Sequence, residues 1–456
     1  MTSGVRCVFL LGGKSYGKSQ RNGDERLMRS TITVIDFGTS KVVALVAEVT
    51  GRQRTDIIGA GIASYDGFAD ARWNNPDLVN DTIAQAVRTA EEQARTNTRE
   101  VFVGVPGQFS RIYTVEVKLD LQGADPHVTS RDIETLFALA NEEVREVRGT
   151  PIHRSPAWFV IDDGKKTLEP LNRHGNELRA MISYVIADQF FIDDVSERLR
   201  AIGKSASGFF STPMGEAMLY ISDEERDRTA LLIDTGYLTT EVMAVEGDTI
   251  IFHKNIPLGG GHITADLTYG LDIPLDQAEQ IKRSYIFGAP ASQPSFDILG
   301  TDGRTQTFAY HKVSEILDAR AEEICDEIAS CVKESGVRLG NWSVVYLTGG
   351  GLAINRGGRE FLSERLGRPV RDLPRKAVKL SSPIYSSALG LLDLIIDTKT
   401  GAGAAQVHVV APRCLAGRKP VGFVLTTCHP PVRPMKRTTG GELLPFNNRV
   451  LDHSSA

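Results

Sequence analysis

Two short segments of this chain place an acidic residue directly after an apolar run and follow it with glycine and hydroxyl residues. The first reads TVIDFGTSKVV, in which Asp36 precedes Gly38, Thr39, Ser40 and Lys41. Backbone N–H groups in a tight turn of small residues bind anions such as phosphate. A carboxylate at the end of a strand can hold Mg²⁺ through water, because Mg²⁺ gives up its hydration shell reluctantly. These residue types predict a site for phosphate and magnesium.

The second segment, LLIDTGYLTTEV, repeats the pattern with Asp234, Thr235, Gly236 and Thr239. Two similar hairpins far apart in one chain suggest two related lobes. If the hairpins face each other across a cleft, they contact a triphosphate from both sides, and Asp36 and Asp234 bind Mg²⁺ through water. Taken alone, either segment is equally well explained as an ordinary hairpin turn.

Three consecutive glycines, Gly349, Gly350 and Gly351, follow a further apolar run in YLTGGGLAI. A glycine has no Cβ, so the backbone at these positions can lie close against a flat base. The two hairpins and the glycine triplet, in this order, favour a nucleotide with Mg²⁺ as the ligand.

The N-terminal segment contains a pattern that imitates a different phosphate site. Residues Gly12–Ser19 match G-x-x-x-x-G-K-S, a loop that binds phosphates only where a helix follows at once. Here Asn22 and Gly23 interrupt any such helix. We therefore expect residues 1–29 to form an unstructured leader, with Met28 as a candidate start.

The composition narrows the class of protein. The chain has 456 residues and a net charge of −5, which allows about two or three domains and gives no general attraction to nucleic acid. No apolar run reaches the ~18 residues that a transmembrane helix needs. The five scattered cysteines are typical of reduced thiols in the cytoplasm. We expect a cytoplasmic protein without a nucleic-acid partner.

Hydrophobic periodicity predicts two lobes, each interrupted by a smaller unit. Helices are expected over 76–96, 129–147, 190–202, 313–335 and 381–396, and a further helix is expected to start directly after the glycine triplet. The expected units are a leader (1–29), a first lobe (31–100 and 187–228) with an inserted α+β subdomain (101–186), a second lobe (229–257 and 340–397) with a small subdomain (258–339), and an irregular tail (400–456).

The order of these segments over about residues 31–397 resembles the actin/Hsp70/sugar-kinase superfamily and, within it, the bacterial cell-division actin FtsA. The resemblance implies an α/β, two-lobed actin-like ATPase fold with a nucleotide cleft between the lobes and an FtsA-type inserted subdomain. The segment QAEQIK is similar to the family's ribose-contacting helix, which nominates Glu279 and Lys282. Segments Gly208–Ala217 and Ser381–Gly390 resemble the two connecting helices at the hinge.

The chain departs from the family pattern in three places. Tyr237 and Leu238 replace glycines of the second phosphate loop, which brings bulk close to the phosphates. Thr212 stands before Pro-Met, where filament-forming relatives carry an acid, so hydrolysis is expected to be weak or absent. The prolines of the tail do not allow the basic amphipathic membrane helix with which FtsA proteins usually end.

The resemblance implies a polymerising ATP-binding protein that links FtsZ to the division machinery at the inner face of the cell membrane. Other division proteins are expected to bind the inserted subdomain. Two alternatives within the superfamily stay open, a small-molecule kinase and an assembly ATPase resembling the pilus protein PilM. A kinase needs an acid to deprotonate its acceptor, and the connecting stretch 203–217 offers only Glu216.

The family receives the short acidic C-terminal tail of FtsZ on the small subdomain of the second lobe. Such a peptide needs cations beside an apolar groove. The candidate residues of this segment are the cations Lys282, Arg283, Arg304, Lys312 and Arg320 and the apolar residues Ile281, Tyr285, Phe287 and Phe308. Arg283 and Arg304 are the strongest candidates, because Lys282 is also assigned to the ribose.

Overall fold

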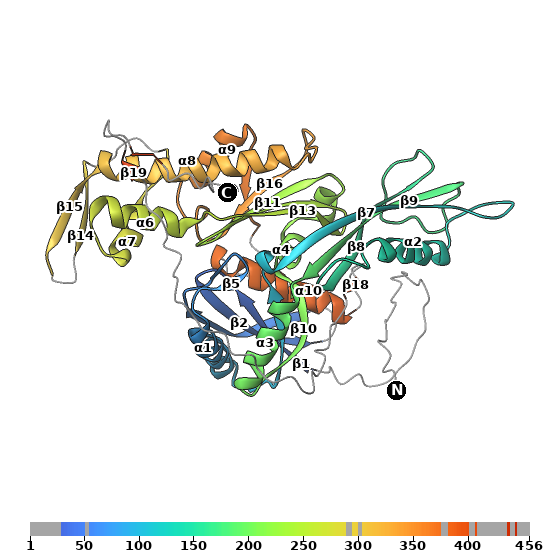
Figure 1. The fold of residues 1–456 in the computed structure, drawn as a ribbon, viewed down its shortest axis with the longest axis horizontal. Helices are drawn as coiled ribbons and strands as arrows, with labels where there is room; N and C mark the ends of the chain where they lie inside the picture. Colours follow the sequence, from blue (N-terminus) through green and yellow to red (C-terminus); the bar gives the residue numbers. More distant parts are fainter. Residues whose placement is uncertain are drawn as a thin grey trace, which may run out of the picture.

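The computed structural model describes residues 29–50, 54–288, 294–299, 303–374 and 382–400, together with short strands at 406–407, 436–437 and 443–444. Figure 1 shows two lobes, one above the other, with a small subdomain at one end of the upper lobe and an inserted subdomain projecting from the other end. The expected leader, with its phosphate-loop pattern, lies outside the described residues, except that Arg29 already belongs to the first strand.

The first lobe is a five-stranded sheet in the order β10-β6-β1-β2-β3. Its strands are β1 (Arg29–Phe37), β2 (Lys41–Thr50), β3 (Arg54–Ser64), β6 (Glu100–Val105) and β10 (Ser205–Ser211). A small hairpin, β4 (Phe68–Ala69) and β5 (Arg72–Trp73), and the helices α1 (Pro76–Ala94) and α3 (Gln189–Ala201) complete it. Strand β3 can lie close to α1 because Gly61 has no side chain, and a Cβ there would be 2.0 Å from the Ala86 carbonyl oxygen. The helices expected over 76–96 and 190–202 are confirmed.

The second lobe repeats the strand arrangement of the first lobe. Its sheet has the order β13-β12-β11-β16-β17, built from β11 (Ala230–Thr235), β12 (Thr240–Glu246), β13 (Thr249–Ile256), β16 (Val345–Thr348) and β17 (Val370–Asp372). In both lobes a central strand pairs with an antiparallel hairpin partner on one side and a parallel strand on the other. Asp36 pairs with Val43, and Asp234 pairs with Glu241, so both carboxylates leave their sheets at the hairpin end.

Helices dominate the small subdomain of the second lobe. It consists of α6 (Gly260–Leu271), α7 (Leu275–Ser284), the hairpin β14 (Ser295–Leu299) and β15 (Thr305–Ala309), and α8 (Tyr310–Glu334). One face of each helix packs into a shared apolar core with the outer face of the second sheet. The prediction of a helix directly after the glycine triplet is wrong. Residues 349–357 form turns and a bend, and α9 (Gly358–Leu366) begins only after Gly357, which has a φ of +82°.

The inserted subdomain is a four-stranded sheet in the order β18-β8-β9-β7. It contains the short helix η1 (Gly107–Phe109), the strands β7 (Ser110–Asp120), β8 (Thr150–Ile161) and β9 (Glu177–Ala187), and α2 (Ser130–Glu143). Because β6 pairs with β1 and β10 in the first sheet, the insertion begins after β6 and not at residue 101. The helix expected over 129–147 is confirmed as α2, with a capping box at Thr129 and Asp132.

Part of the tail forms regular structure, so the expectation of an irregular tail is wrong at those residues. Strand β18 (Gln406–Val407) pairs with β8 of the inserted sheet, and β19 (Lys436–Arg437) pairs with β20 (Leu443–Leu444). Whether the rest of the tail carries a membrane anchor lies outside the described residues. In the part of the chain that the structure describes, no helix is long and apolar enough to cross a membrane.

Two helices lie between the lobes and join their cores. Helix α4 (Thr212–Tyr220) packs against α10 (Ser386–Thr400), which follows the short helix η2 (Pro383–Tyr385). They approach closely where Gly215 meets Gly390, since a Cβ on Gly215 would lie 2.6 Å from the Gly390 carbonyl carbon. Their apolar residues belong to one core with the facing sides of both sheets. The small residues of these segments therefore allow the two lobes to share a core.

Candidate functional site

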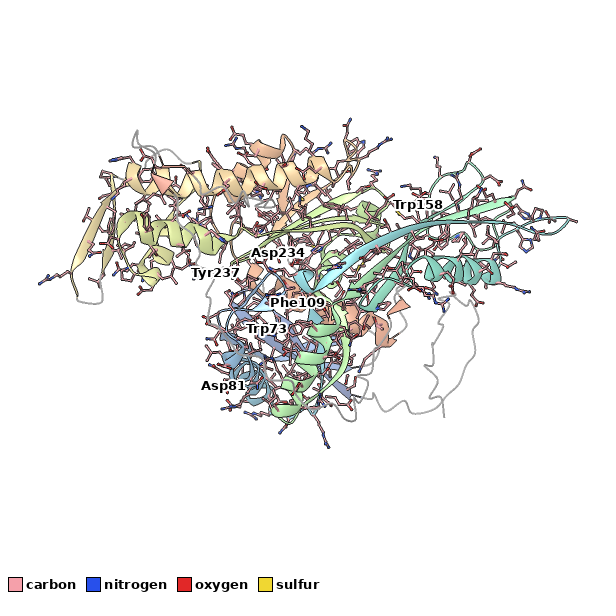
Figure 2. The ribbon with its side chains drawn as sticks, in the orientation of Figure 1. Trp73, Asp81, Phe109, Trp158, Asp234 and Tyr237 are labelled. Carbon is pink, nitrogen blue, oxygen red and sulfur yellow. The ribbon has the colours of Figure 1, made fainter. Side chains whose placement is uncertain are left out.

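A cavity of about 730 Å³ lies between the lobes, with walls from both hairpins and both connecting helices. Figure 2 shows Asp234 and Tyr237 in the upper lobe, above Trp73 and Phe109 of the lower lobe. Most of the residues predicted for nucleotide and metal line this cavity: Asp36, Gly38, Thr39, Ser40, Lys41, Asp234, Gly236, Thr239, Glu279, Lys282, Gly349 and Gly350. The two remaining residues, Thr235 and Gly351, lie directly behind it, where the Gly351 N–H donates to the Thr235 carbonyl oxygen at 2.6 Å.

The first hairpin turn is held from within the first lobe. The Gly38 N–H donates to the Lys41 carbonyl oxygen at 2.9 Å, and the Tyr65 hydroxyl donates to the Gly38 carbonyl oxygen at 2.9 Å. Asp36 is buried, and its Oδ1 accepts a hydrogen bond of 3.1 Å from the Thr212 hydroxyl of α4. Burial raises the pKa of Asp36 to about 6, although the Thr212 hydroxyl and the Lys41 charge oppose the rise.

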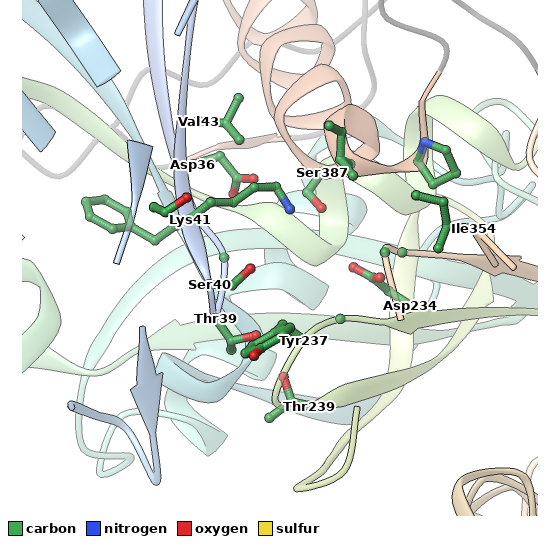
Figure 3. Close-up of a pocket in the computed structure, with 18 of the residues that line it drawn as sticks. Asp36, Thr39, Ser40, Lys41, Val43, Asp234, Tyr237, Thr239, Ile354 and Ser387 are labelled. Atoms are coloured by element: carbon green, nitrogen blue, oxygen red, sulfur yellow. The ribbon is translucent and has the colours of Figure 1, made fainter. Parts of the chain in front are cut away.

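Lys41 extends into the cavity between the two hairpins, and Figure 3 shows its amine on the side of the cavity where Asp36 lies. Burial lowers the pKa of Lys41, while the charges of Asp36 and Asp234 act in the opposite direction. A cationic side chain between two carboxylates, inside a cavity, is suited to a phosphate that brings its own divalent cation.

The second hairpin turn is fixed by the start of α6. The carbonyl oxygens of Gly236 and Tyr237 accept hydrogen bonds from the N–H groups of Gly260 and Gly261, at 2.9 and 2.7 Å. This contact requires glycines, because a Cβ on Gly261 would lie 2.8 Å from the Tyr237 ring. The predicted bulk of Tyr237 is therefore accommodated by the glycines at the start of α6, and its ring lies beside Thr39 at the cavity (Figure 3).

One carboxylate oxygen of Asp234 is buried without a hydrogen-bond partner among the described residues. Its Oδ1 is buried and makes no hydrogen bond to any residue that the structure describes. Gly349 has a φ of +91° and passes close beside it, and a Cβ on Gly349 would lie 2.1 Å from this oxygen. Burial raises the pKa of Asp234 to about 7, and the neighbouring Glu241 charge adds to the rise while Lys41 opposes it.

Glu216, which the sequence offered only as the acid that a kinase would need, lines the cavity, although the phosphate-loop motifs did not nominate it. It lies on α4 one turn after Thr212, it is 1% exposed, and its carboxylate lines the cavity. Its Oε1 has no hydrogen-bond partner among the described residues. Burial and the charge of Asp234 raise the pKa of Glu216 well above its usual range, against a hydrogen bond from Ser386. The i to i+4 spacing from Thr212 on a helix was the signal that could have found it.

Glu279 and Lys282 border the cavity on α7, but the structure gives them unequal access to a ligand. The Lys282 ammonium is 1% exposed and contacts the Gly260 carbonyl oxygen, the Thr264 hydroxyl and Glu279, at 3.0, 2.8 and 2.6 Å. An ammonium has three N–H groups, so all of its donors already have protein acceptors. Lys282 therefore orients Glu279, and of the two only Glu279 has lone pairs left for a ribose hydroxyl.

The cavity residues fit a hydrated Mg²⁺ and a polyphosphate. Asp234 Oδ1, at the end of β11, is a buried oxygen without a partner among the described residues. Gly38 and Ser40 of the first turn and Gly236 and Thr239 of the second line the cavity, and Lys41 supplies a positive charge. Carboxylates of this kind are ligands that Mg²⁺ accepts through its water shell.

Comparison with known proteins finds similarity to one family of bacterial proteins. The family model described as "Cell division protein FtsA" matches residues 231–390, which contain the second hairpin, the small subdomain and the start of α10. The cell division protein FtsA of Neisseria meningitidis serogroup B is 27% identical over 374 residues, which cover 79% of this chain and 89% of the relative. FtsA of Rhizobium meliloti is 25% identical over 426 residues, 87% of this chain and 95% of the relative. This chain is therefore similar to FtsA proteins over most of its length.

A solved structure agrees with this relationship at the level of the fold. The structure titled "PilM-PilN type IV pilus biogenesis complex" superposes with a TM-score of 0.56 and 17% sequence identity, covering 80% of this chain and 98% of that chain. The two-lobed actin-like fold expected from the sequence is therefore confirmed. FtsA is the relationship that sequence identity supports over most of the chain.

The residues predicted to bind the tail of FtsZ are divided between core and surface. Arg320 is 2% exposed and forms an ion pair with Asp266, so it is not available to a peptide. Ile281, Tyr285 and Phe287 are buried in the small subdomain, so the predicted apolar groove is wrong at these positions. The exposed cations of the set are Arg283, Arg304 and Lys312, and Arg283 pairs with Glu279 at 2.9 Å.

Proposed function

We propose that this FtsA relative binds ATP with Mg²⁺ between its lobes, forms filaments, and links FtsZ to the division machinery at the inner face of the membrane. The observation that carries the nucleotide part is the convergence of two separate hairpins on one cavity. The identity to FtsA over most of the chain supports the role in cell division.

Specific roles for the cavity residues follow from their chemistry. The turn at Gly38–Lys41 and the turn at Gly236–Thr239 would hold the phosphates, with Lys41 as the cation. Asp36 and Asp234 would hold Mg²⁺ through water, and the bound Mg²⁺ would neutralise phosphate charge. Gly349 and Gly350 would face the base. Actin-like ATPases generally bind nucleotide with Mg²⁺, which agrees with this arrangement.

The partner surfaces are proposed from exposure and charge. The FtsZ tail is short and acidic, so exposed cations on the small subdomain would attract it. Arg304 directly precedes β15, Lys312 lies in the first turn of α8, and both are exposed. Arg283 is exposed as well, and it pairs with the cavity residue Glu279. The inserted subdomain would receive other division proteins or a second copy of this chain.

Co-sedimentation with FtsZ filaments tests the proposed function. The purified protein is mixed with polymerised FtsZ, with and without Mg²⁺ and ATP, and the pellet is quantified. We expect more protein in the pellet with FtsZ that retains its C-terminal tail than with FtsZ that lacks it, and a further increase when ATP is present. FtsZ without the tail is the control. Equal pelleting with and without the tail would contradict the FtsZ link and favour a different assembly role.

A further inference from the structure

Glu216 has a position in the cavity that is fixed by its neighbours. On α4 it follows Thr212 by four residues, so both side chains lie on the same face of the helix. The Thr212 hydroxyl donates to Asp36, which turns that face toward the cavity. Ser386 hydrogen-bonds Glu216 and also contacts the Thr348 hydroxyl at the end of β16, at 3.0 Å. The Glu216 carboxylate therefore lies where the two lobes meet.

The surroundings of Glu216 do not account for a buried carboxylate. The charged neighbours that act on it are Asp234, Glu241 and Asp36, all of them acidic. Its Oε1 lacks a hydrogen-bond partner within the described part of the chain. A buried polar atom without a partner is costly to stability. Such a group, facing a cavity, is expected where a ligand or a reacting water supplies the missing contact.

We propose that Glu216 is the catalytic proton acceptor when a bound nucleoside triphosphate is hydrolysed in this cavity. The inference rests on the proposed nucleotide site. The water oxygen forms a bond to the terminal phosphorus, and the bond from that phosphorus to the bridging oxygen breaks. The bridging oxygen keeps the electron pair as part of the diphosphate, and the water proton passes to Glu216 Oε1. The products are the nucleoside diphosphate and inorganic phosphate.

Two features of the site agree with this assignment. Thr212 has no acidic group and its hydroxyl is already committed to Asp36, so it does not take the proton. The pKa of the Glu216 carboxyl is raised by burial, and a carboxylate with a raised pKa is a better proton acceptor than an exposed one. Thr212 alone predicts weak or absent hydrolysis. With Glu216 as the proton acceptor, we instead expect ATP hydrolysis that depends on Glu216.

The test compares the full chain with its Glu216→Gln variant, which keeps the size of the side chain and removes the acceptor. In single-turnover experiments with Mg²⁺ and ATP we expect the variant to lose at least about 100-fold in rate. A second readout is the binding of ADP with aluminium fluoride, a mimic of the transferring phosphoryl group. The wild type is expected to bind this mimic more tightly than ADP, and the variant to lose most of that preference.

The control is Glu224→Gln, an exposed position on α5 (Asp223–Arg226) outside the cavity, which is expected to behave like the wild type. Glu216→Ala is the second variant, and added formate is expected to restore part of its hydrolysis rate. Wild-type hydrolysis rates in Glu216→Gln, or no ATP hydrolysis by a wild type that binds ATP, would overturn the role of Glu216. A wild type that binds no ATP would instead overturn the proposed nucleotide site.

Discussion

The Thr39 hydroxyl accepts a hydrogen bond of 3.0 Å from the Leu238 backbone N–H, which joins the two hairpin turns across the cavity. The two residues are 199 positions apart and belong to different lobes. Backbone N–H groups of such a turn are the donors expected to bind phosphate. The contact therefore closes the lobes over the cavity and uses one donor of the second turn.

Removing this contact should speed the exchange of bound nucleotide. Thr39→Val keeps the shape of the side chain and leaves the Leu238 N–H without its acceptor. A neutral hydrogen bond contributes about 1 kcal/mol, so we expect dissociation of a fluorescent ATP analogue to accelerate by roughly fivefold. Stopped-flow displacement measures the rate. Thr39→Ser retains the hydroxyl and serves as the control, and equal rates in both variants would show that the contact does not limit exchange.

The acidic residues of the cavity should make the ligand-free protein more stable in mild acid than at alkaline pH. The folded-state pKa values of Asp36 and Asp234, about 6 and about 7, lie above the usual value of 3.8. The folded state then binds these protons more tightly, so this stabilisation is present at low pH and is lost as pH rises through 6 to 7. Between about pH 5 and about pH 8 each group accounts for about 1–3 kcal/mol.

Chemical denaturation across this pH range checks the prediction. Asp36→Asn and Asp234→Asn should each flatten the pH dependence and stabilise the ligand-free protein at the alkaline end. Asp81→Asn, an exposed carboxylate on α1, is the control. A pH dependence that is the same in all three variants would assign it to groups other than Asp36 and Asp234.

The crossing of α4 and α10 should not accept a side chain. Gly215→Ala places a Cβ 2.6 Å from the Gly390 backbone, which forces the helices apart. Overpacking of this kind costs about 1–3 kcal/mol in the free energy of unfolding. Because these helices also carry Glu216 and Ser386, nucleotide affinity should fall as well. Gly340→Ala, at an exposed glycine where a Cβ would meet only Ser343 Oγ at 4.0 Å, should leave both quantities close to the wild type.

The proposed FtsZ surface predicts a charge-dependent interaction. Reversing Arg304 and Lys312 to glutamate should weaken binding of an FtsZ tail peptide, measured by fluorescence anisotropy, and leave ATP binding unchanged. Affinity should also fall as salt rises through about 0.15 M, because exposed charges are screened there. A peptide affinity that responds to neither salt nor charge reversal would place the partner on a different surface.

The hairpins were predictable from sequence because their residue types are local and repeat. Each turn is recognised by an acid, glycine and hydroxyl residues after an apolar strand. This local pattern does not depend on how the two lobes are arranged in space. The long helices α1 and α8 were predictable for a similar reason, since their buried residues recur at helical spacing.

Features that depend on tertiary contacts were not predictable in this way. Glu216 is one of 57 acidic residues, and only the direction of α4 brings it to the cavity. Lys282 has the expected position, but its donors are satisfied by contacts that no spacing reveals. The sequence places strand β6 in the insertion, and only its pairing with β1 shows that it belongs to the first sheet.

The binding of ATP with Mg²⁺ is the central claim, and the melting temperature measures it most directly. A ligand that binds only the folded state stabilises it by about 2.7 kcal/mol at 100 times its dissociation constant. We expect ATP to raise the melting temperature of the wild type further when Mg²⁺ is present. We expect Asp36→Ala and Asp234→Ala each to lose the Mg²⁺-dependent part of this rise. A rise that depends on Mg²⁺ and survives in both variants would contradict the assignment of the two hairpins.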